Sequence, residues 1–284
     1  MRQVSASQVA AAATADQYLD ALASEYRVSE PTILTVAPEQ FGGLTGGGWP
    51  LRDALLNAVA QSAWMLRQNA PAPLALLSGA ANLSMHVATE VADAGRGAEQ
   101  AAMAARDWPT GYVRMVEPGA CSRCIILAGK HYKWNRGFDR HPKCKCVHIP
   151  AGEDADVPET NPQAYFDKLP KAEQDRIFTK AGAEAIRQGA DMNQIVNARL
   201  GITTATVGGR EVTATTQGTS RKSYMASVRK AIDQERGTRS VKRPRLMPEE
   251  INRQANGDKA EARRLLISNG YIVGDISALA REAA

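Results

Sequence analysis

All four cysteines of the 284-residue chain lie within one segment of 26 residues, Cys121–Cys146. With His141 included, the pattern is C-x2-C-x16-H-x2-C-x-C, in which two close pairs flank a longer loop. A chain encloses a tetrahedral zinc ion in this way, because each pair supplies two ligands from one turn. We therefore expect a closed metal-binding module here. Its candidate ligands are Cys121, Cys124, His141, Cys144 and Cys146.

Five candidates compete for four positions. Cys144 and Cys146 would point to the same side of a strand, whereas His141 and Cys144 would form a second turn-type pair. The sequence leaves both choices open. His131 and His148 are weaker candidates, more typical of surface residues or of residues that support the ligands.

Two other uses of the cysteines are less favoured. Disulfides suit small exported domains, whereas this chain is long enough to build a core and its first residues lack the basic head and leucine-rich stretch of a signal peptide. A C-x2-C redox pair would leave Cys144 and Cys146 without a role. Bound zinc is therefore the favoured interpretation.

The surroundings of the cysteines favour a structural metal. A catalytic zinc keeps an open position and a nearby acid or base, yet no glutamate lies between Glu117 and Glu153, and Asp139 is the only acid between the cysteines. A finger-type nuclease with His141 as general base is the enzymatic alternative, but it lacks a partner residue. Hydrolase and phosphate-loop motifs are absent, and His86 with Glu90, four residues apart, is interpreted as a structural helix pair.

The charge is divided along the chain. Residues 1–110 hold six Arg, no Lys and ten acidic residues, a net of −4, whereas residues 111–284 hold 29 basic and 20 acidic residues, a net of +9. This predicts two surfaces with different partners, one of them a polyanion, although a solvated basic face is an alternative. The candidate nucleic-acid contacts are Arg123, Lys130, Lys133, Arg136, Lys143, Lys145, Arg221, Lys222, Arg229, Lys230, Arg239, Lys242, Arg243 and Arg245.

The pattern of apolar residues predicts a mainly helical fold. Aromatic residues make up only 5% of the chain and alanine is abundant, which favours helices with thin contact faces. No uncharged apolar run reaches the roughly 18 residues of a membrane span, so a chain neither inserted nor exported is expected. Helices are expected at 5–26, 50–68, 74–106 (kinked or split at Gly79, Gly95 and Gly97) and 170–188, a strand at 112–116 and a hairpin around Gly208-Gly209. The predicted organisation is an Ala-rich helical region (1–110), a zinc-knuckle α+β module (111–150), a helical segment (151–201), a β-hairpin and basic segment (202–246) and a C-terminal helical segment (247–284).

Several blocks of the chain resemble a known family. They are the cysteine module, "FTKAGAEAIRQGADMNQIVNARLGI", "GGREVTATTQGTSRK" and "PEEINRQANGDKAEARRLLISNGYI". Together they resemble the phage Mu F-like minor head proteins of tailed phages, especially those of actinobacterial phages, over about residues 112–272. The resemblance implies a virion protein of the capsid interior or portal vertex, present in the host cytoplasm during assembly. The implied partners are the portal, the major capsid protein or the scaffold, and packaged double-stranded DNA bound without sequence preference.

Many members of that family are labelled capsid maturation proteases. No Ser/His/Asp or Cys/His set in this sequence supports that activity, so the favoured hypothesis is a structural, morphogenetic protein with a structural Zn²⁺. A maturation protease is the first alternative, and a zinc-finger DNA-binding or nuclease protein is the second. The acidic, alanine-rich residues 1–110 are predicted to dock on the portal or shell.

Overall fold

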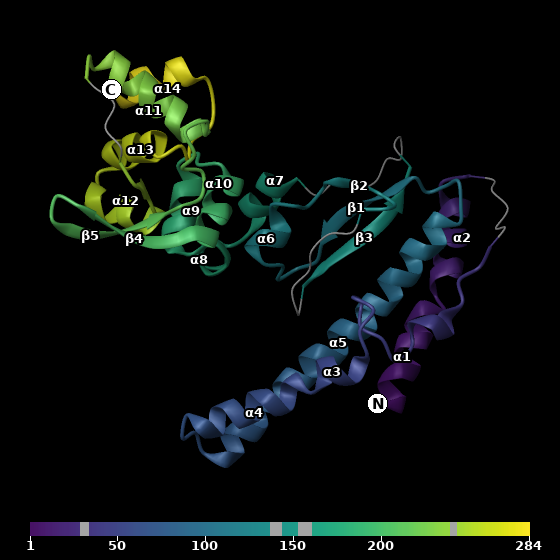
Figure 1. Cartoon of the computed structure of the whole chain (residues 1–284). Coiled ribbons are helices and arrows are strands. Elements are labelled where there is room, and N and C mark those ends of the chain that lie inside the picture. The colour runs from purple at the N-terminus through teal and green to yellow at the C-terminus, as the bar shows by residue number, and fades with distance from the viewer. Residues whose placement is uncertain (29–33, 137–143, 153–160, 239–242) are drawn as a thin grey trace. The chain divides into compact units, whose positions relative to one another are not determined.

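The computed structural model describes residues 1–28, 34–136, 144–152, 161–238 and 243–284 (Figure 1). The chain divides into two compact units. Unit 1 comprises Met1–Ala120 and Ala128–Thr160, and unit 2 comprises Cys121–Leu127 and Asn161–Ala284. Both are rich in helices and each contains one small antiparallel sheet, which confirms the predicted mainly α class. Among the described residues, none of the helices has the length and apolar character needed to cross a membrane.

Unit 1 begins with helices. The structure has two helices where the sequence predicts one at 5–26, because the Thr14 hydroxyl donates a hydrogen bond to the Ala11 carbonyl at 2.8 Å and the chain tightens there. The elements are α1 (Arg2–Ala12), α2 (Ala15–Glu25), the 3-10 helix η1 (Pro38–Phe41), α3 (Leu51–Leu55), α4 (Asn57–Arg67) and α5 (Ala72–Ala104).

Helix α5 runs unbroken for 33 residues, so the split predicted at its glycines is wrong. The glycines instead let other segments approach. A Cβ at Gly79 would lie 2.9 Å from the Ala58 carbonyl oxygen, and one at Gly97 would lie 3.2 Å from the Phe41 ring. Neighbouring helices therefore offset the low helix propensity of these residues by packing closely against them.

The core of unit 1 lies where α1 and α2 cover the second half of α5. Its fully buried residues include Leu19, Ala98, Met103 and Tyr112. Arg106, just beyond α5, forms ion pairs with Asp16 and Asp20 of α2 at 3.1 and 2.7 Å.

A three-stranded sheet completes unit 1. It consists of β1 (Gly111–Val116), β2 (His131–Lys133) and β3 (Cys146–Ala151), with β1 in the middle and both pairings antiparallel. The strand predicted at 112–116 is thus confirmed as β1. Because Val116 pairs with Cys146 and Arg114 with His148, the register places Arg114 beside the start of β3.

Unit 2 is a helical assembly around a short sheet. The predicted hairpin is confirmed as β4 (Ile202–Val207) and β5 (Arg210–Thr215), joined through Gly208 and Gly209, which both have positive φ. The helix predicted at 170–188 is divided at Thr179. The other elements are α6 (Ser122–Ile125), α7 (Pro162–Lys168), α8 (Lys171–Phe178), α9 (Lys180–Arg187), α10 (Met192–Ala198), η2 (Arg199–Gly201), α11 (Tyr224–Glu235), β6 (Arg245–Leu246), α12 (Pro248–Ala255), α13 (Lys259–Ser268) and α14 (Ile276–Ala283).

The core of unit 2 includes a buried arginine. Arg245 is 2% exposed and donates hydrogen bonds to the carbonyl oxygens of Asn269 (2.8 Å), Gln217 (3.0 Å) and Gly270 (3.2 Å). Its guanidinium also lies over the Tyr271 ring, 4.3 Å from the centroid. It thereby satisfies backbone carbonyls that burial would otherwise leave unpaired. The apolar core around it includes Ile195, Val228, Ile251, Leu266 and Ile267.

Candidate metal centre

Cysteines from two distant positions converge on one point. The Sγ atoms of Cys124, Cys144 and Cys146 all lie within 4.8 Å of one another. The Sγ of Cys121 lies 3.4 Å from that of Cys124, and none of the four cysteines is in a disulfide. Cys124 and Cys146 are buried, whereas Cys121 and Cys144 are partly exposed. The structure therefore brings together a group of thiols that could hold a metal ion.

Local structure explains why the thiols of Cys121 and Cys124, the first pair, lie close together. Gly119 adopts a φ of +82°, which favours glycine, in the turn closed by the Ala120 N–H and the Glu117 carbonyl. Cys121 is the extended N-cap of α6, and Cys124 follows one helical turn later. Residues three apart on a helical turn lie on the same side, so both thiols of the first pair face one point.

The second pair follows from strand geometry. Cys146 begins β3, and Cys144 precedes it by two residues, so their side chains point to the same side of the extended chain. Their Sγ atoms lie 2.7 Å apart. The predicted candidate His141 lies outside the described residues, as does Asp139. The sequence left two alternatives for the second pair of ligands. Among the described residues, the pair that forms is Cys144 with Cys146.

The donor set fits zinc. Thiolates at about 2.3 Å from a tetrahedral zinc ion lie about 3.8 Å from one another. The separation within the first pair, 3.4 Å, is close to this value. The separation within the second pair, 2.7 Å, is smaller, so Cys144 and Cys146 would move apart by about 1 Å on binding metal.

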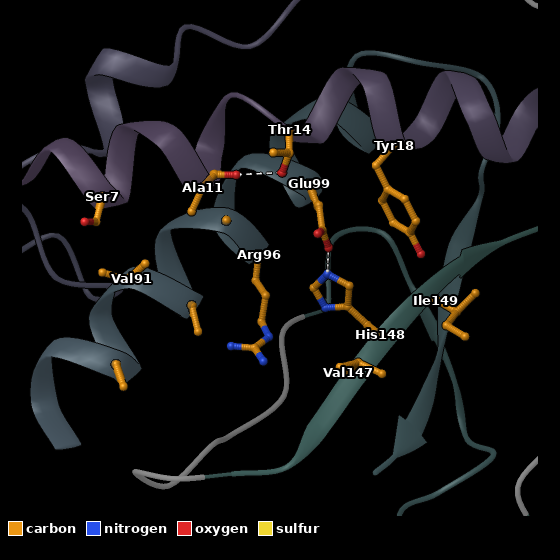
Figure 2. A pocket seen from close by; sticks show the side chains of 13 residues that line it. Ser7, Ala11, Thr14, Tyr18, Val91, Arg96, Glu99, Val147, His148 and Ile149 are labelled. Atoms are coloured by element: carbon orange, nitrogen blue, oxygen red, sulfur yellow. Dashed lines mark hydrogen bonds and ion pairs between the residues drawn. The ribbon is translucent and has the colours of Figure 1, made fainter. Parts of the chain in front are cut away.

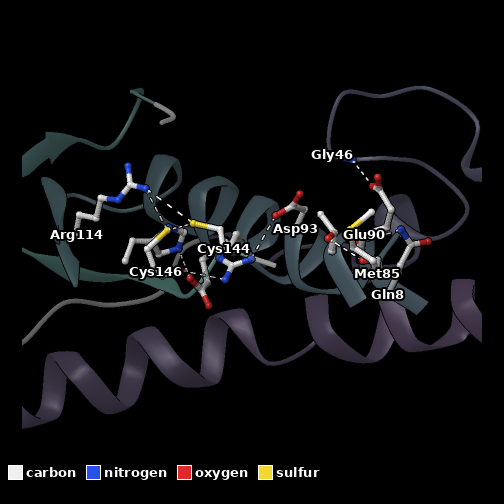
Figure 3. A network of polar contacts seen from close by, with 12 residues as sticks. Gln8, Gly46, Met85, Glu90, Asp93, Arg114, Cys144 and Cys146 are labelled. Atoms are coloured by element: carbon white, nitrogen blue, oxygen red, sulfur yellow. Dashed lines mark hydrogen bonds and ion pairs between the residues drawn. The ribbon is translucent and has the colours of Figure 1, made fainter. Parts of the chain in front are cut away.

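A buried cation lies against the second pair (Figure 3). Arg114 of β1 is 2% exposed, and its Nη2 lies 3.2 Å from the Sγ of Cys146 and 4.0 Å from that of Cys144. Zinc with three or four thiolates carries a net negative charge, which such a cation stabilises. The candidate residues predicted from the sequence do not include Arg114. The sequence feature that could have indicated a buried role for Arg114 is its position as the one charged residue of the apolar strand "GYVRMV".

Helix α5 holds the backbone of the second pair in place. Arg96 donates from Nη2 to the Cys146 carbonyl oxygen at 3.3 Å, and its Nη1 pairs with Asp93 at 3.3 Å. Two residues after Cys146, the Nε2 of buried His148 pairs with the carboxylate of Glu99. The ring centroids of His148 and Tyr112 lie 5.1 Å apart. His148 thus supports the segment that carries Cys146, and its Nε2 contacts a carboxylate.

A cavity of about 770 Å³ lies beside these contacts within unit 1. Figure 2 shows Arg96, Glu99 and His148 in its wall, with Tyr18 of α2 facing them. Burial, together with the charge of Glu99, raises the pKa of Tyr18 to about 12. The Glu99 carboxylate in this wall is engaged by His148, which is a structural pairing.

The predicted nucleic-acid contacts divide into three groups. Residues 143, 239 and 242 lie outside the described part of the chain. Arg243 pairs with the buried Asp233 at 2.7 Å. Arg243 is exposed, and the other exposed members are Arg123, Lys130, Lys133, Arg136, Lys145, Arg221, Lys222 and Lys230.

Arg229 and Arg245 correct the prediction of surface contacts. Arg229 donates to the backbone carbonyls of Ser268 (2.8 Å) and Pro244 (2.9 Å), and burial, reinforced by neighbouring Arg243 and Arg245, lowers its pKa to about 10. Arg245 is the buried core residue described above. Both arginines therefore hold the interior of unit 2 together, and sequence alone does not separate such residues from a basic surface.

The weaker histidine candidates, His131 and His148, do not belong to the thiol group that the described residues form. His131 is exposed at the start of β2, and His86 is a partly buried residue of α5. The fold and site thus define a mainly helical protein with a cysteine cluster able to hold a metal ion. Comparison with known proteins finds no matching family model, no matching curated protein and no matching solved structure.

Proposed function

We propose that the protein is a structural minor head protein of a tailed phage, in which Zn²⁺ held by Cys121, Cys124, Cys144 and Cys146 stabilises the middle of the chain. The observation that carries the metal site is the convergence of thiols beside the buried guanidinium of Arg114. The resemblance of residues 112–272 to Mu F-like proteins supports the head role.

The chemistry of the donors supports a structural use of the metal. Four thiolates would complete the tetrahedral coordination and leave no position for water, which a zinc hydrolase requires. The buried group placed beside the second pair is the cation Arg114, which has no role as a general base. A zinc nuclease would need an open coordination position with a general base beside it.

The exposed cations support contact with packaged DNA. Arg123, Lys130, Lys133, Arg136 and Lys145 surround the cysteines in the sequence and are all exposed. Lysine and arginine bind phosphates without reading bases, so a protein that lies against packaged DNA needs only such contacts.

Mass spectrometry of purified virions and procapsids tests the head role. We expect the chain in both, at a few copies per particle. Its absence from both particles would contradict the head role and leave the zinc proposal standing, because zinc content is measured on the isolated protein. Incubation with the cognate capsid and scaffold proteins is expected to leave both full-length, and cleavage would favour the protease alternative.

A further inference from the structure

The chain contains two Asn-Gly sequences, and both lie in unit 2. They are Asn256-Gly257, in the turn between α12 and α13, and Asn269-Gly270, directly after α13 (Figure 1). Asparagine followed by glycine is the pair most prone to spontaneous deamidation, because glycine has no side chain to hinder attack by its backbone nitrogen and leaves the backbone free to rotate. The structure places the two pairs in opposite environments.

The reaction that deamidates such a pair sets conditions on its surroundings. The glycine backbone nitrogen gives up its proton and attacks the asparagine Cγ, the Cγ–Nδ2 bond breaks, and the amide nitrogen leaves as ammonia with that proton. Water then opens the resulting succinimide ring at either carbonyl, which gives aspartate or isoaspartate. Ring closure therefore requires a free side-chain amide, a glycine N–H outside any hydrogen bond and a backbone that can rotate at the asparagine ψ.

The turn at Asn256-Gly257 meets these conditions. Asn256, Gly257 and Asp258 are all exposed. Among the described residues, neither the Asn256 side chain nor the Gly257 N–H takes part in a hydrogen bond. A Cβ at Gly257 would meet no atom within 4 Å, so the turn has room to move. The hydrogen bond that closes the turn runs from the Asp258 N–H to the Ala255 carbonyl at 2.8 Å, and exposed turns of this kind open at little cost.

The second pair, Asn269-Gly270, is held by the core of unit 2. Asn269 is 2% exposed, and its side-chain oxygen accepts hydrogen bonds from Arg229 at 2.7 Å and from the Leu246 N–H at 2.9 Å. The Gly270 N–H donates to the Ile267 carbonyl at 2.8 Å. Deamidation here would first have to break these hydrogen bonds, which requires the core to open.

We propose that Asn256 is a deamidation site, at which the folded protein forms aspartate and isoaspartate, whereas the fold protects Asn269. Both products add a negative charge between two helices. Isoaspartate also routes the main chain through the former side chain, which lengthens the turn by a methylene group. The added length moves the Asp258 N–H away from the Ala255 carbonyl, together with the Asp258 side chain that caps α13 through the Ala260 N–H at 2.8 Å. This proposal depends neither on the head function nor on zinc.

The test follows both sites in the full-length chain during incubation at mildly alkaline pH and physiological temperature. Peptide mapping with electron-transfer fragmentation identifies the modified residue and distinguishes aspartate from isoaspartate. We expect the products to form at Asn256 at least about tenfold faster than at Asn269, because the hydrogen bonds around Asn269 must break first. In guanidinium chloride, where both pairs are unfolded, the two rates should become similar.

Asn256→Gly is the matched control. Glycine favours the left-handed conformation that Asn256 adopts, with a φ of +46°, and it has no side-chain amide to lose. Total isoaspartate, measured by methylation with a protein isoaspartyl methyltransferase, should fall sharply in this variant. The proposal is overturned if Asn256 reacts only in the unfolded chain, if both asparagines react at the same rate in the folded protein, or if Asn256→Gly retains the isoaspartate of the wild type.

Discussion

The guanidinium of Arg114 lies 3.2 Å from the Sγ of Cys146, and both residues are buried on adjacent strands of one sheet. A buried cation is costly unless it is paired. A thiolate set around zinc supplies the matching negative charge, so the arginine and the metal site stabilise each other.

Replacing Arg114 should weaken zinc binding. Arg114→Met removes the cation beside the thiolates while keeping a long side chain, and we expect a loss of about 10- to 100-fold in zinc affinity, the range seen for residues that support metal ligands. Competition with a chromophoric chelator measures the change. Lys133→Met, which removes an exposed cation from the same sheet, is the control and should bind zinc as the wild type does. Equal affinities in all three proteins would contradict the role assigned to Arg114.

Ligand variants should decide whether Cys121 or His141 is the fourth ligand beside Cys124, Cys144 and Cys146. Cys121→Ser is expected to lose zinc and to destabilise the middle of the chain by several kcal/mol, because a structural zinc contributes directly to folding. His141→Ala should keep about one zinc per chain. Metal analysis and hydrogen exchange over 111–150 provide the readouts. Loss of zinc in His141→Ala with retention in Cys121→Ser would assign the fourth ligand to the histidine.

Thr179 carries backbone strain that polar contacts offset. Its φ of +64° and ψ of 156° lie in a region favoured by glycine. Its hydroxyl accepts hydrogen bonds from the Gly182 N–H (3.2 Å) and from Arg199 (2.7 Å). Thr179→Ala loses these hydrogen bonds and keeps the backbone strain. Thr179→Gly loses the hydrogen bonds and also relieves the strain. We therefore expect the glycine variant to be more stable than the alanine variant by about 1 kcal/mol or more in urea unfolding. The reverse order would show that this backbone is unstrained.

Buried and exposed cations of unit 2 should behave differently. Arg245→Met leaves the carbonyls of Asn269, Gln217 and Gly270 without a donor, and we expect a loss of about 3 kcal/mol or more in unfolding free energy. Lys222→Ala with Lys230→Ala should leave stability unchanged. This pair should weaken binding to duplex DNA and reduce the slope of log K against log salt by about 2, through two lost phosphate contacts. Unchanged DNA affinity and slope would mean that these lysines are only a solvated surface.

The features predicted from sequence are the local ones. Cysteines two and three residues apart fix the two thiol pairs, and Gly208-Gly209 fixes the hairpin, because these geometries are set within a few residues. The role of Arg114 depends on the pairing of β1 with β3, across more than 30 residues, so no local pattern reports it. Likewise, Arg245 resembles a surface cation in the sequence, and only the packing of α13 and the following turn around it shows that it is buried.

The glycines of α5 are a further case in which local sequence does not reveal tertiary packing. Their low helix propensity predicts a split, yet α5 is continuous, and Gly79 and Gly97 lie at close approaches of α4 and Phe41. Tertiary packing outweighs a propensity of about 1 kcal/mol per glycine. Positions that break a local rule inside a continuous helix are therefore informative about packing.

Zinc content, combined with X-ray absorption at the zinc edge, tests the central claim most directly. Protein purified under reducing conditions without added metal should contain about one zinc per chain, with a first shell of sulfur at about 2.3 Å. Zinc-free protein with the four cysteines joined in two disulfides, or a zinc shell dominated by nitrogen and oxygen, would contradict the thiolate centre on which this account is built.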